Sequence, residues 1–235
     1  MGSKINLFKG WIKLSFIDYP DKLSTVLFTE GCNFRCPYCH NFDLVLPNNL
    51  EVINIEKILN FLEKRKRKID AVVISGGEPF LHGKELEDFV KKARIMDFLI
   101  KIDTNGSFPE KVFDWDRRGL VDFWAVDFKV PFEKYDLVQG NGEKMKITIR
   151  YLLEKDTPST YELRTTIFPR FHSIEVLTKM LFEIEGATMW YWQNFRNDRT
   201  LDESAALVEP YSKDLLNEWK SRLDVFKKVG KIIIR

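Results

Sequence analysis

Short apolar runs alternate with amphipathic stretches along most of this chain, and this alternation constrains the fold more than any other feature. Ser24–Thr29 reads as a buried strand, and residues 55–66 follow with Ile58 and Leu62 on one face of a helix. The same pattern predicts further strands at residues 71–74, 99–104, 123–128, 161–167 and 188–192. It predicts further helices at residues 84–95, 109–118, 143–155, 174–184 and 212–229. This alternation indicates parallel strands joined by right-handed crossovers.

The expected fold class is α/β, a partial (β/α)6 TIM-like barrel in a single domain. A closed TIM barrel needs about eight strand–helix units, so a shorter series leaves the barrel open. A chain of 235 residues fits one domain of this kind. We expect a lead-in at residues 1–23, the strand–helix core at 24–192, and a C-terminal loop and helix at 193–235. Chemistry in such barrels sits in the loops that follow the strands, so residues at strand ends are the candidates for function.

Charge and hydropathy narrow the classes of partner. The formal net charge is +2, which argues against nucleic acid. The basic run at residues 63–68 falls at the end of an expected helix, where cations complement the helix dipole, and we interpret it as a solvated helix end. No apolar run reaches the about 18 residues of a membrane span, and no signal peptide is apparent. We therefore expect a cytoplasmic protein with no membrane partner.

A cluster of cysteines directly follows the first expected strand. Cys32, Cys36 and Cys39 are the only cysteines in the chain, and they have the spacing C-x3-C-x2-C. An odd number of clustered thiols favours a metal or redox site over a disulfide framework. Three soft thiolates suit a 4Fe–4S cluster in which one iron keeps an open position. The alternatives are zinc, for which His40 is poorly placed as a fourth ligand, and buried structural cysteines.

Polar motifs also follow the later strands, and each has a plain alternative. Gly76 and Gly77 would let a ligand approach the backbone, and Glu78 could accept a hydrogen bond from an ammonium group, but a strand-to-helix turn would look the same. Residues Asp103 to Gly106 could form an ordinary turn, and Asp127 and Lys129 could form a surface ion pair. The aromatic residues 190–192 could pack in the core or contact an adenine. We expect His82 and His172 on surface loops. His40 has either a cofactor role or a supporting role beside the cysteines.

The segment Gly31–Asn41 resembles the signature of the radical S-adenosylmethionine (SAM) superfamily, and Ser75–Pro79 resembles its second signature. The resemblance implies that Cys32, Cys36 and Cys39 hold a 4Fe–4S cluster whose free iron binds SAM. It also implies that the second signature binds the methionyl amino group through its backbone and that Tyr38 lies near the adenine. We expect cofactor contacts from Tyr38, His40, Asn41, Gly76, Gly77, Glu78, Asp103, Asn105, Lys129 and Arg164.

The motifs after the third and fourth expected strands resemble those of glycyl-radical-enzyme activating proteins. In the pyruvate formate-lyase activases, matching positions hold a monovalent cation beside the cofactor carboxylate. The resemblance implies such a site formed by oxygens of Asp103, Thr104 and Asp127 and by the carbonyl of Val126. It places Lys129 toward the cofactor or the target backbone.

The segment Ser15–Pro20, followed by the cysteine motif, is similar to anaerobic ribonucleoside-triphosphate reductase activating proteins. This similarity implies that the reduced cluster passes an electron to SAM and that the resulting 5′-deoxyadenosyl radical removes a Cα hydrogen from a glycine of a partner enzyme. The expected partners are an anaerobic ribonucleotide reductase and a flavodoxin- or ferredoxin-type electron donor. An open barrel without a lid also favours a protein substrate.

Three alternatives remain open from the sequence. The chain could activate another glycyl radical enzyme, such as a pyruvate formate-lyase. It could act on a small molecule, in the manner of a 7-carboxy-7-deazaguanine synthase. It could also be a non-catalytic iron–sulfur carrier, which would not cleave SAM.

Overall fold

The computed structural model describes residues 7–46, 50–154 and 160–235. The chain divides into two compact units, which are described separately. The first unit contains the residues up to Asn33, Asn41–Thr104 and Glu110–Trp124, and the second contains Phe34–His40, Asn105–Pro109 and Ala125–Arg235. Strand β5 (Phe123–Asp127) contributes residues to both.

Parallel strands form the centre of the first unit. Its strands are β1 (Phe8–Ser15), β2 (Ser24–Thr29), β3 (Ala71–Gly76) and β4 (Leu99–Thr104). Strands β2 and β3 pair in parallel over their whole length, and β4 continues the parallel order beside β3. Most residues of β2 and β3 are buried, as expected for parallel strands that are covered on both faces of the sheet. Strand β1 differs because it pairs with β2 in the antiparallel sense.

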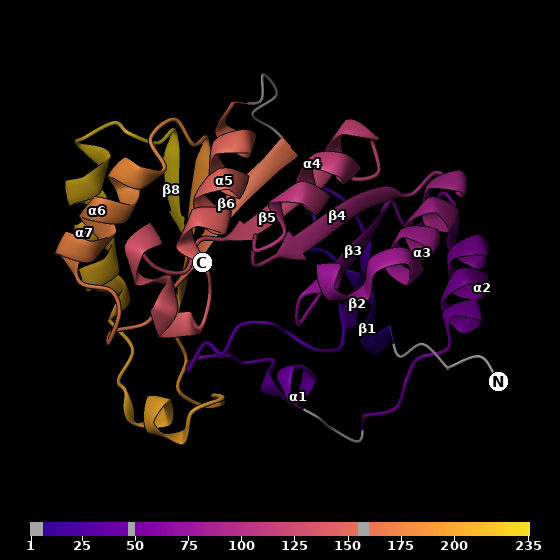
Figure 1. The fold of residues 1–235 in the computed structure, drawn as a ribbon, viewed down its shortest axis with the longest axis horizontal. Helices are drawn as coiled ribbons and strands as arrows, with labels where there is room; N and C mark the ends of the chain where they lie inside the picture. Colours follow the sequence, from indigo (N-terminus) through magenta and orange to yellow (C-terminus); the bar gives the residue numbers. More distant parts are fainter. Residues whose placement is uncertain (1–6, 47–49, 155–159) are drawn as a thin grey trace. The chain divides into compact units, whose positions relative to one another are not determined.

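Helices of the first unit follow its strands. They are α1 (Phe42–Val45), α2 (Ile55–Arg65), the 3-10 helix η1 (Pro79–His82), α3 (Gly83–Ile95) and most of α4 (Pro109–Arg117). Asn54 caps α2 by accepting a hydrogen bond from the amide of Glu56. The buried face of α2 carries Ile58, Leu59 and Leu62, as the sequence pattern predicts. Figure 1 shows α2 and α3 side by side.

The second unit repeats the strand–helix order. Its elements are η2 (Phe132–Val138), α5 (Gly142–Leu153), β6 (Tyr161–Ile167), α6 (Ile174–Glu183), β7 (Met189–Asn194), η4 (Glu203–Leu207), α7 (Lys213–Asp224) and β8 (Lys231–Ile234). Strands β6, β7 and β8 pair in parallel in that order. Helices α6 and α7 lie next to each other (Figure 1). The buried residues of β7 include Trp190 and Trp192, both fully enclosed.

The α/β prediction is confirmed, and the six expected strands are present within two residues of the expected bounds. Two strands were missed, because β1 lies in the expected lead-in and β8 follows Gly230 at the end of the chain. The last helix ends at Asp224 and not near residue 229. In the described part of the chain, no helix has both the length and the apolar character to cross a membrane.

Candidate active site

The first unit fixes the start of the cysteine loop through Gly31. The amide of Gly31 donates to the carbonyl of Leu44 at 2.6 Å, and its carbonyl accepts from the amide of Glu78 at 2.7 Å. Gly31 has a φ of +81°, a left-handed conformation that favours glycine. These bonds tie the residue before Cys32 to helix α1 and to the turn after β3.

The turn after β3 needs its glycines for contacts within the protein. A Cβ on Gly77 would lie 1.7 Å from the Gly31 carbonyl oxygen, and a Cβ on Gly76, whose φ is +116°, would lie 2.3 Å from the Thr29 amide nitrogen. Asn41 donates from its side-chain amide to the carbonyl of Gly76 at 3.4 Å. The structure therefore explains these glycines by the close packing of this turn on the start of the cysteine loop. The ligand approach that the sequence predicts for them stays a prediction.

Glu78 is completely buried and joins the ends of two strands. Its Oε1 accepts from the hydroxyl of Thr104 at 2.9 Å and from the amide of Phe80 at 3.1 Å. The second bond caps helix η1. Glu78 therefore fixes the carboxyl end of β3 to that of β4, a role that the sequence did not indicate. Its expected contact with an ammonium group stays a prediction.

Lys101 is a buried cation at this site that the sequence analysis missed. Its ammonium lies 3.4 Å from Asp103 and donates to the carbonyl of Asp18 at 2.6 Å. Its side chain is 3% exposed. Asp18 belongs to the segment that resembles the reductase activases, and its carboxylate accepts from the hydroxyl of Ser15. A lysine inside an apolar strand, two residues before an aspartate on the same face, was the signal for this pair.

In the second unit, the rest of the cysteine loop is held by backbone hydrogen bonds. The amide of Cys39 donates to the carbonyl of Cys36 at 3.1 Å, the amide of Arg35 to Val138 at 2.9 Å, and the amide of Asp202 to Pro37 at 3.0 Å. Cys36 is buried and Cys39 is partly exposed, and neither forms a disulfide. The backbone hydrogen bonds therefore hold this part of the loop in a defined conformation with both thiols reduced.

Tyr38 has an unsatisfied hydroxyl among aromatic rings. Its ring packs against Phe168 and Phe171, with centroids 5.2 and 5.9 Å away, and it is 4% exposed. The hydroxyl has no hydrogen-bond partner among the described residues. Burial, and then the nearby Cys36 sulfur, raise the pKa of Tyr38 well above its usual value. A buried polar atom without a partner carries an energetic cost, so this site suits a ligand that would bond to it.

His40 presents a similar orphan atom beside the last cysteine. Its Nδ1 is buried with no partner in the described residues, and its ring lies 6.4 Å from that of Phe195. Burial, and then the charge of Arg196, lower the pKa of His40. The imidazole is therefore neutral at pH 7, with a nitrogen able to bond to a ligand.

Asp127, Lys129 and Arg164 form one charge network. Lys129 Nζ donates to one Asp127 oxygen at 3.1 Å, and Arg164 donates to the other from Nε at 3.0 Å, with Nη2 at 2.9 Å. Burial alone would raise the pKa of Asp127, but the charges of Arg164 and Lys129 outweigh it and the pKa is lowered. The carboxylate is thus ionised and held by two cations, which is more than the surface ion pair considered from the sequence.

His172 is a core residue, so its expected place on a surface loop is wrong. Its Nδ1 accepts from the amide of Phe168 at 2.9 Å, and its Nε2 donates to the carbonyl of Lys129 at 2.9 Å. Burial lowers the pKa of His172 to about 4, so the ring is neutral. His82 is also not a free surface group, because it is half-buried and its Nε2 lies 2.6 Å from the Glu30 carbonyl oxygen.

Trp190, in the aromatic segment of β7, packs in the core. Its indole nitrogen donates to Thr165 at 2.8 Å, and the Thr165 hydroxyl donates to the Phe128 carbonyl at 2.5 Å. Asn105 is buried and accepts from the amide of Ser107 at 3.0 Å through its side chain. These bonds join β7 to β6 and β6 to the residue after β5, and they fix the loop after β4 in the second unit.

The expected metal ligands are distributed over both units. Cys32 belongs to the first and Cys36 and Cys39 to the second, and the cation ligands divide in the same way. In the part of the chain that the structure describes, no three histidine, cysteine, aspartate or glutamate side chains already form a metal-binding group. The residue types nevertheless fit a thiolate-bound cluster, because none of the three cysteines forms a disulfide, and Tyr38 and His40 beside Cys39 have buried polar atoms without a hydrogen-bond partner among the described residues.

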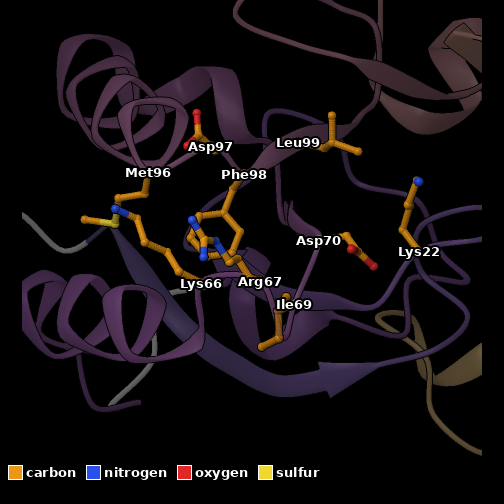
Figure 2. A pocket seen from close by; sticks show the side chains of 9 residues that line it. All are labelled: Lys22, Lys66, Arg67, Ile69, Asp70, Met96, Asp97, Phe98 and Leu99. Carbon is orange, nitrogen blue, oxygen red and sulfur yellow. The ribbon is translucent and has the colours of Figure 1, made fainter.

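A separate pocket of the first unit lies at the amino ends of its parallel strands, away from the carboxyl ends that carry the candidate site residues (Figure 2). It has a volume of about 350 Å³, and its walls come from the residues that precede β3 and β4 and follow α2 and α3. Asp70 is already bonded to the amide of Leu23 at 2.9 Å, and Lys66 and Arg67 follow the carboxyl end of α2, where cations complement the dipole. Barrel chemistry occurs at the carboxyl ends of strands, so this pocket is apart from the candidate site.

A family model named Radical SAM superfamily matches residues 26–172. The fold of that superfamily is a partial TIM barrel, which confirms the predicted fold class. Among solved structures, SuiB of Streptococcus suis bound to the precursor peptide SuiA gives a TM-score of 0.64 at 12% identity. The match covers 89% of this chain and 48% of SuiB, so the chain spans about half of that protein, and the likeness concerns the fold alone.

Three relatives with curated names extend the comparison. The chain is 32% identical over 235 residues to a protein of Methanocaldococcus jannaschii provisionally named a glycyl-radical enzyme activating enzyme, covering 97% of this chain and 95% of the relative. It is 33% identical over 231 residues to the pyruvate formate-lyase-activating enzyme of Clostridium pasteurianum, covering 86% and 95%. It is 30% identical over 173 residues to the 7-carboxy-7-deazaguanine synthase of M. jannaschii, covering 68% and 70%.

Proposed function

Because this chain belongs to the radical SAM superfamily, we propose that it is an activating enzyme that generates a glycyl radical on a partner enzyme. The observation that carries the proposal is the extent of similarity to the M. jannaschii relative named for this activity, which spans 97% of the chain. The similarity to a pyruvate formate-lyase-activating enzyme supports the same class of reaction. The match to the deazaguanine synthase covers less of the chain, at 68%.

The superfamily works with a 4Fe–4S cluster and SAM, and the proposal assigns each to residues of this chain. Cys32, Cys36 and Cys39 would hold the cluster. The backbone of the turn after β3, with His40, Asn41, Asn105, Lys129 and Arg164, would bind SAM, and Tyr38 would lie near its adenine. When bound, this pair supplies the one-electron chemistry that removes a hydrogen atom from the substrate.

The chain's own residues would position and shield these groups. Phe168 and Phe171 pack against Tyr38 and exclude water from its side of the cysteine loop. The neutral His172 fixes the backbone of Lys129, whose ammonium, with Arg164, holds the Asp127 carboxylate ionised. A fixed, charged network beside the cofactor residues can orient a zwitterionic ligand without rearranging when it binds.

The finer assignments are part of the same proposal. The target would be the glycine loop of an anaerobic ribonucleotide reductase, on the basis of the Ser15–Pro20 segment and the cysteine motif, and the electron donor a flavodoxin or ferredoxin. A monovalent cation would bind oxygens of Asp103, Thr104, Val126 and Asp127. Both carboxylates already have protein cations, Lys101 at Asp103 and Lys129 with Arg164 at Asp127, so the metal ion would compete with or supplement them. We also propose a cytoplasmic location.

Product analysis tests the reaction class. Reconstituted, reduced protein should cleave SAM to methionine and 5′-deoxyadenosine. When the reductase is added, it should gain activity, and SAM should be the only small-molecule substrate consumed apart from the reductant. Consumption of a purine-like small molecule in place of protein activation would overturn the assignment in favour of a synthase. Failure to cleave SAM at all would leave a non-catalytic iron–sulfur carrier.

A further inference from the structure

Part of the outer side of strand β1 is unpaired among the described residues, and this makes it a candidate interaction surface of the first unit. Among the described strands, β1 pairs with β2 alone. Near its start, the outer side is occupied, because the amide of Ile53 donates to Phe8 at 2.9 Å and Lys9 reaches the carbonyl of Leu50 at 2.6 Å. From Gly10 to Ser15, no described residue bonds to the outer backbone. Alternate residues of such an edge direct both backbone groups outward and can pair with another strand.

Large apolar side chains are exposed along the same edge. Ile12 and Leu14 are 45% and 48% exposed, and Phe16 and Ile17, just beyond the strand, are 72% and 84% exposed. Ile12 faces away from its neighbour Trp11 because β1 pairs regularly with β2 at these two residues, and the register shifts only between Ile12 and Ser15. Several exposed apolar side chains close together on a sheet edge are typical of an interaction site.

The other face of β1 opens on a groove shared with helix α2. The groove has a volume of about 480 Å³, and it is lined by Trp11, whose ring packs edge-to-face on that of Phe61 with centroids 4.9 Å apart. The Trp11 indole nitrogen donates to Thr25 at 2.8 Å, which fixes the ring. The groove is therefore a rigid feature and not an accident of mobile side chains.

The charge of this groove is positive. Lys13, Lys57 and Lys64 line it with a single carboxylate, Glu56. None of the three lysines has an ion-pair partner among the described residues, and Lys13 lies over the Trp11 ring with its nitrogen 5.7 Å from the centroid. Unpaired lysines at an edge oppose pairing with a second copy, because two antiparallel β1 strands would bring their lysines together.

We propose that β1 binds an extended segment of a partner protein as an added strand, and that this segment alternates apolar and acidic residues. Its apolar side chains would cover Ile12 and Leu14, and its acidic side chains would face Lys13, Lys57 and Lys64 on the groove side. Backbone hydrogen bonds to β1 would supply much of the affinity, and the lysines would select acidic segments. The inference is independent of the activase function, since β1 carries no cofactor residue.

A blocked nine-residue peptide of alternating valine and glutamate is the probe for this surface. It should bind the full chain and slow amide hydrogen exchange at residues 10–15, and binding should weaken as salt rises because the attraction is electrostatic. The double variant Lys13→Glu, Lys57→Glu should reduce affinity by at least about tenfold, since it replaces two attractive contacts between opposite charges with two repulsive contacts between like charges. Both lysines are exposed, so this variant should keep the fold.

Two controls keep the test decisive. Lys84→Glu, an exposed charge reversal elsewhere in the first unit, should leave affinity unchanged, and a peptide with lysine in place of glutamate should not bind. Equal binding of both peptides, or indifference to the double variant, would overturn the proposal. Sedimentation that shows a dimer, converted to a monomer by Leu14→Lys, would instead assign the edge to a second copy of the chain.

Discussion

Replacing Gly77 with alanine should destabilise the protein and disturb the start of the cysteine loop. The added Cβ would lie 1.7 Å from the Gly31 carbonyl oxygen and 2.5 Å from its carbonyl carbon, where contacts below 3.0 Å are essentially never seen. The two backbones must therefore separate by about 1.3 Å, from 3.0 minus 1.7. The movement would also break the hydrogen bond from the amide of Glu78 to Gly31, which is 2.7 Å long.

The magnitude follows from these two effects. Overpacking in a rigid region costs about 1–3 kcal/mol, and loss of a backbone hydrogen bond adds about 0.5–1.5 kcal/mol. We expect a loss of about 2–4 kcal/mol in the free energy of unfolding, measured by urea denaturation of the metal-free protein followed by circular dichroism. Since Gly31 is bonded to Cys32, iron retained after reconstitution should fall as well.

Gly119 provides the matched control. It has a φ of +62°, but a Cβ there would meet nothing within 4 Å. Gly119→Ala should therefore cost only about 1–2 kcal/mol, the strain of a left-handed alanine, and should leave the iron content unchanged. If Gly77→Ala proves no less stable than Gly119→Ala and retains iron equally well, the explanation by close packing on Gly31 is wrong.

Three further predictions concern the cluster, a buried histidine and a cation. Anaerobic reconstitution should give about four irons and four sulfides per chain, measured by colorimetric analysis, and Cys36→Ala should abolish the charge-transfer absorbance; tight binding of a single zinc would contradict this. The pKa of His172 is lowered from 6.5 to about 4, so the unfolded chain binds a proton that the folded chain lacks between these values, and stability should fall by roughly 3 kcal/mol as the pH drops through that window. His172→Gln should flatten this part of a stability-against-pH curve, and an unchanged curve would exclude the assignment. Activity should depend on potassium or sodium, and Asp127→Ala should remove that dependence with much of the activity; a wild-type enzyme indifferent to monovalent cations would count against the site.

The strands could be predicted because a buried parallel strand is an uninterrupted apolar run, as in Ser24–Thr29 and Ala71–Gly76. Strand β1 was missed because Lys9, Gly10 and Lys13 interrupt its apolar residues, a composition typical of an edge. Strand β8 was missed because it has only four residues, and the glycine before it was interpreted as the end of the last helix and not as the start of a strand.

The candidate site could be predicted in outline because its motifs follow strands. Hydrogen-bond partners that come from distant segments of the chain could not be predicted. The bond between Glu78 and Thr104, and the bridge of His172 from Phe168 to Lys129, join segments whose proximity no local pattern encodes. Lys101 lies between these two cases. A lysine within an apolar strand predicts that a buried partner exists, but it does not identify the Asp18 carbonyl as that partner.

Electron paramagnetic resonance of the reconstituted protein mixed with an anaerobic ribonucleotide reductase, SAM and a reductant tests the central claim most directly. The account predicts a doublet radical signal on the reductase, caused by the one Cα hydrogen that the glycyl radical keeps. The doublet should collapse to a singlet when both Cα hydrogens of the target glycine are replaced by deuterium. A protein that cleaves SAM under these conditions, yet leaves every glycyl radical enzyme offered to it without this signal, would contradict the account.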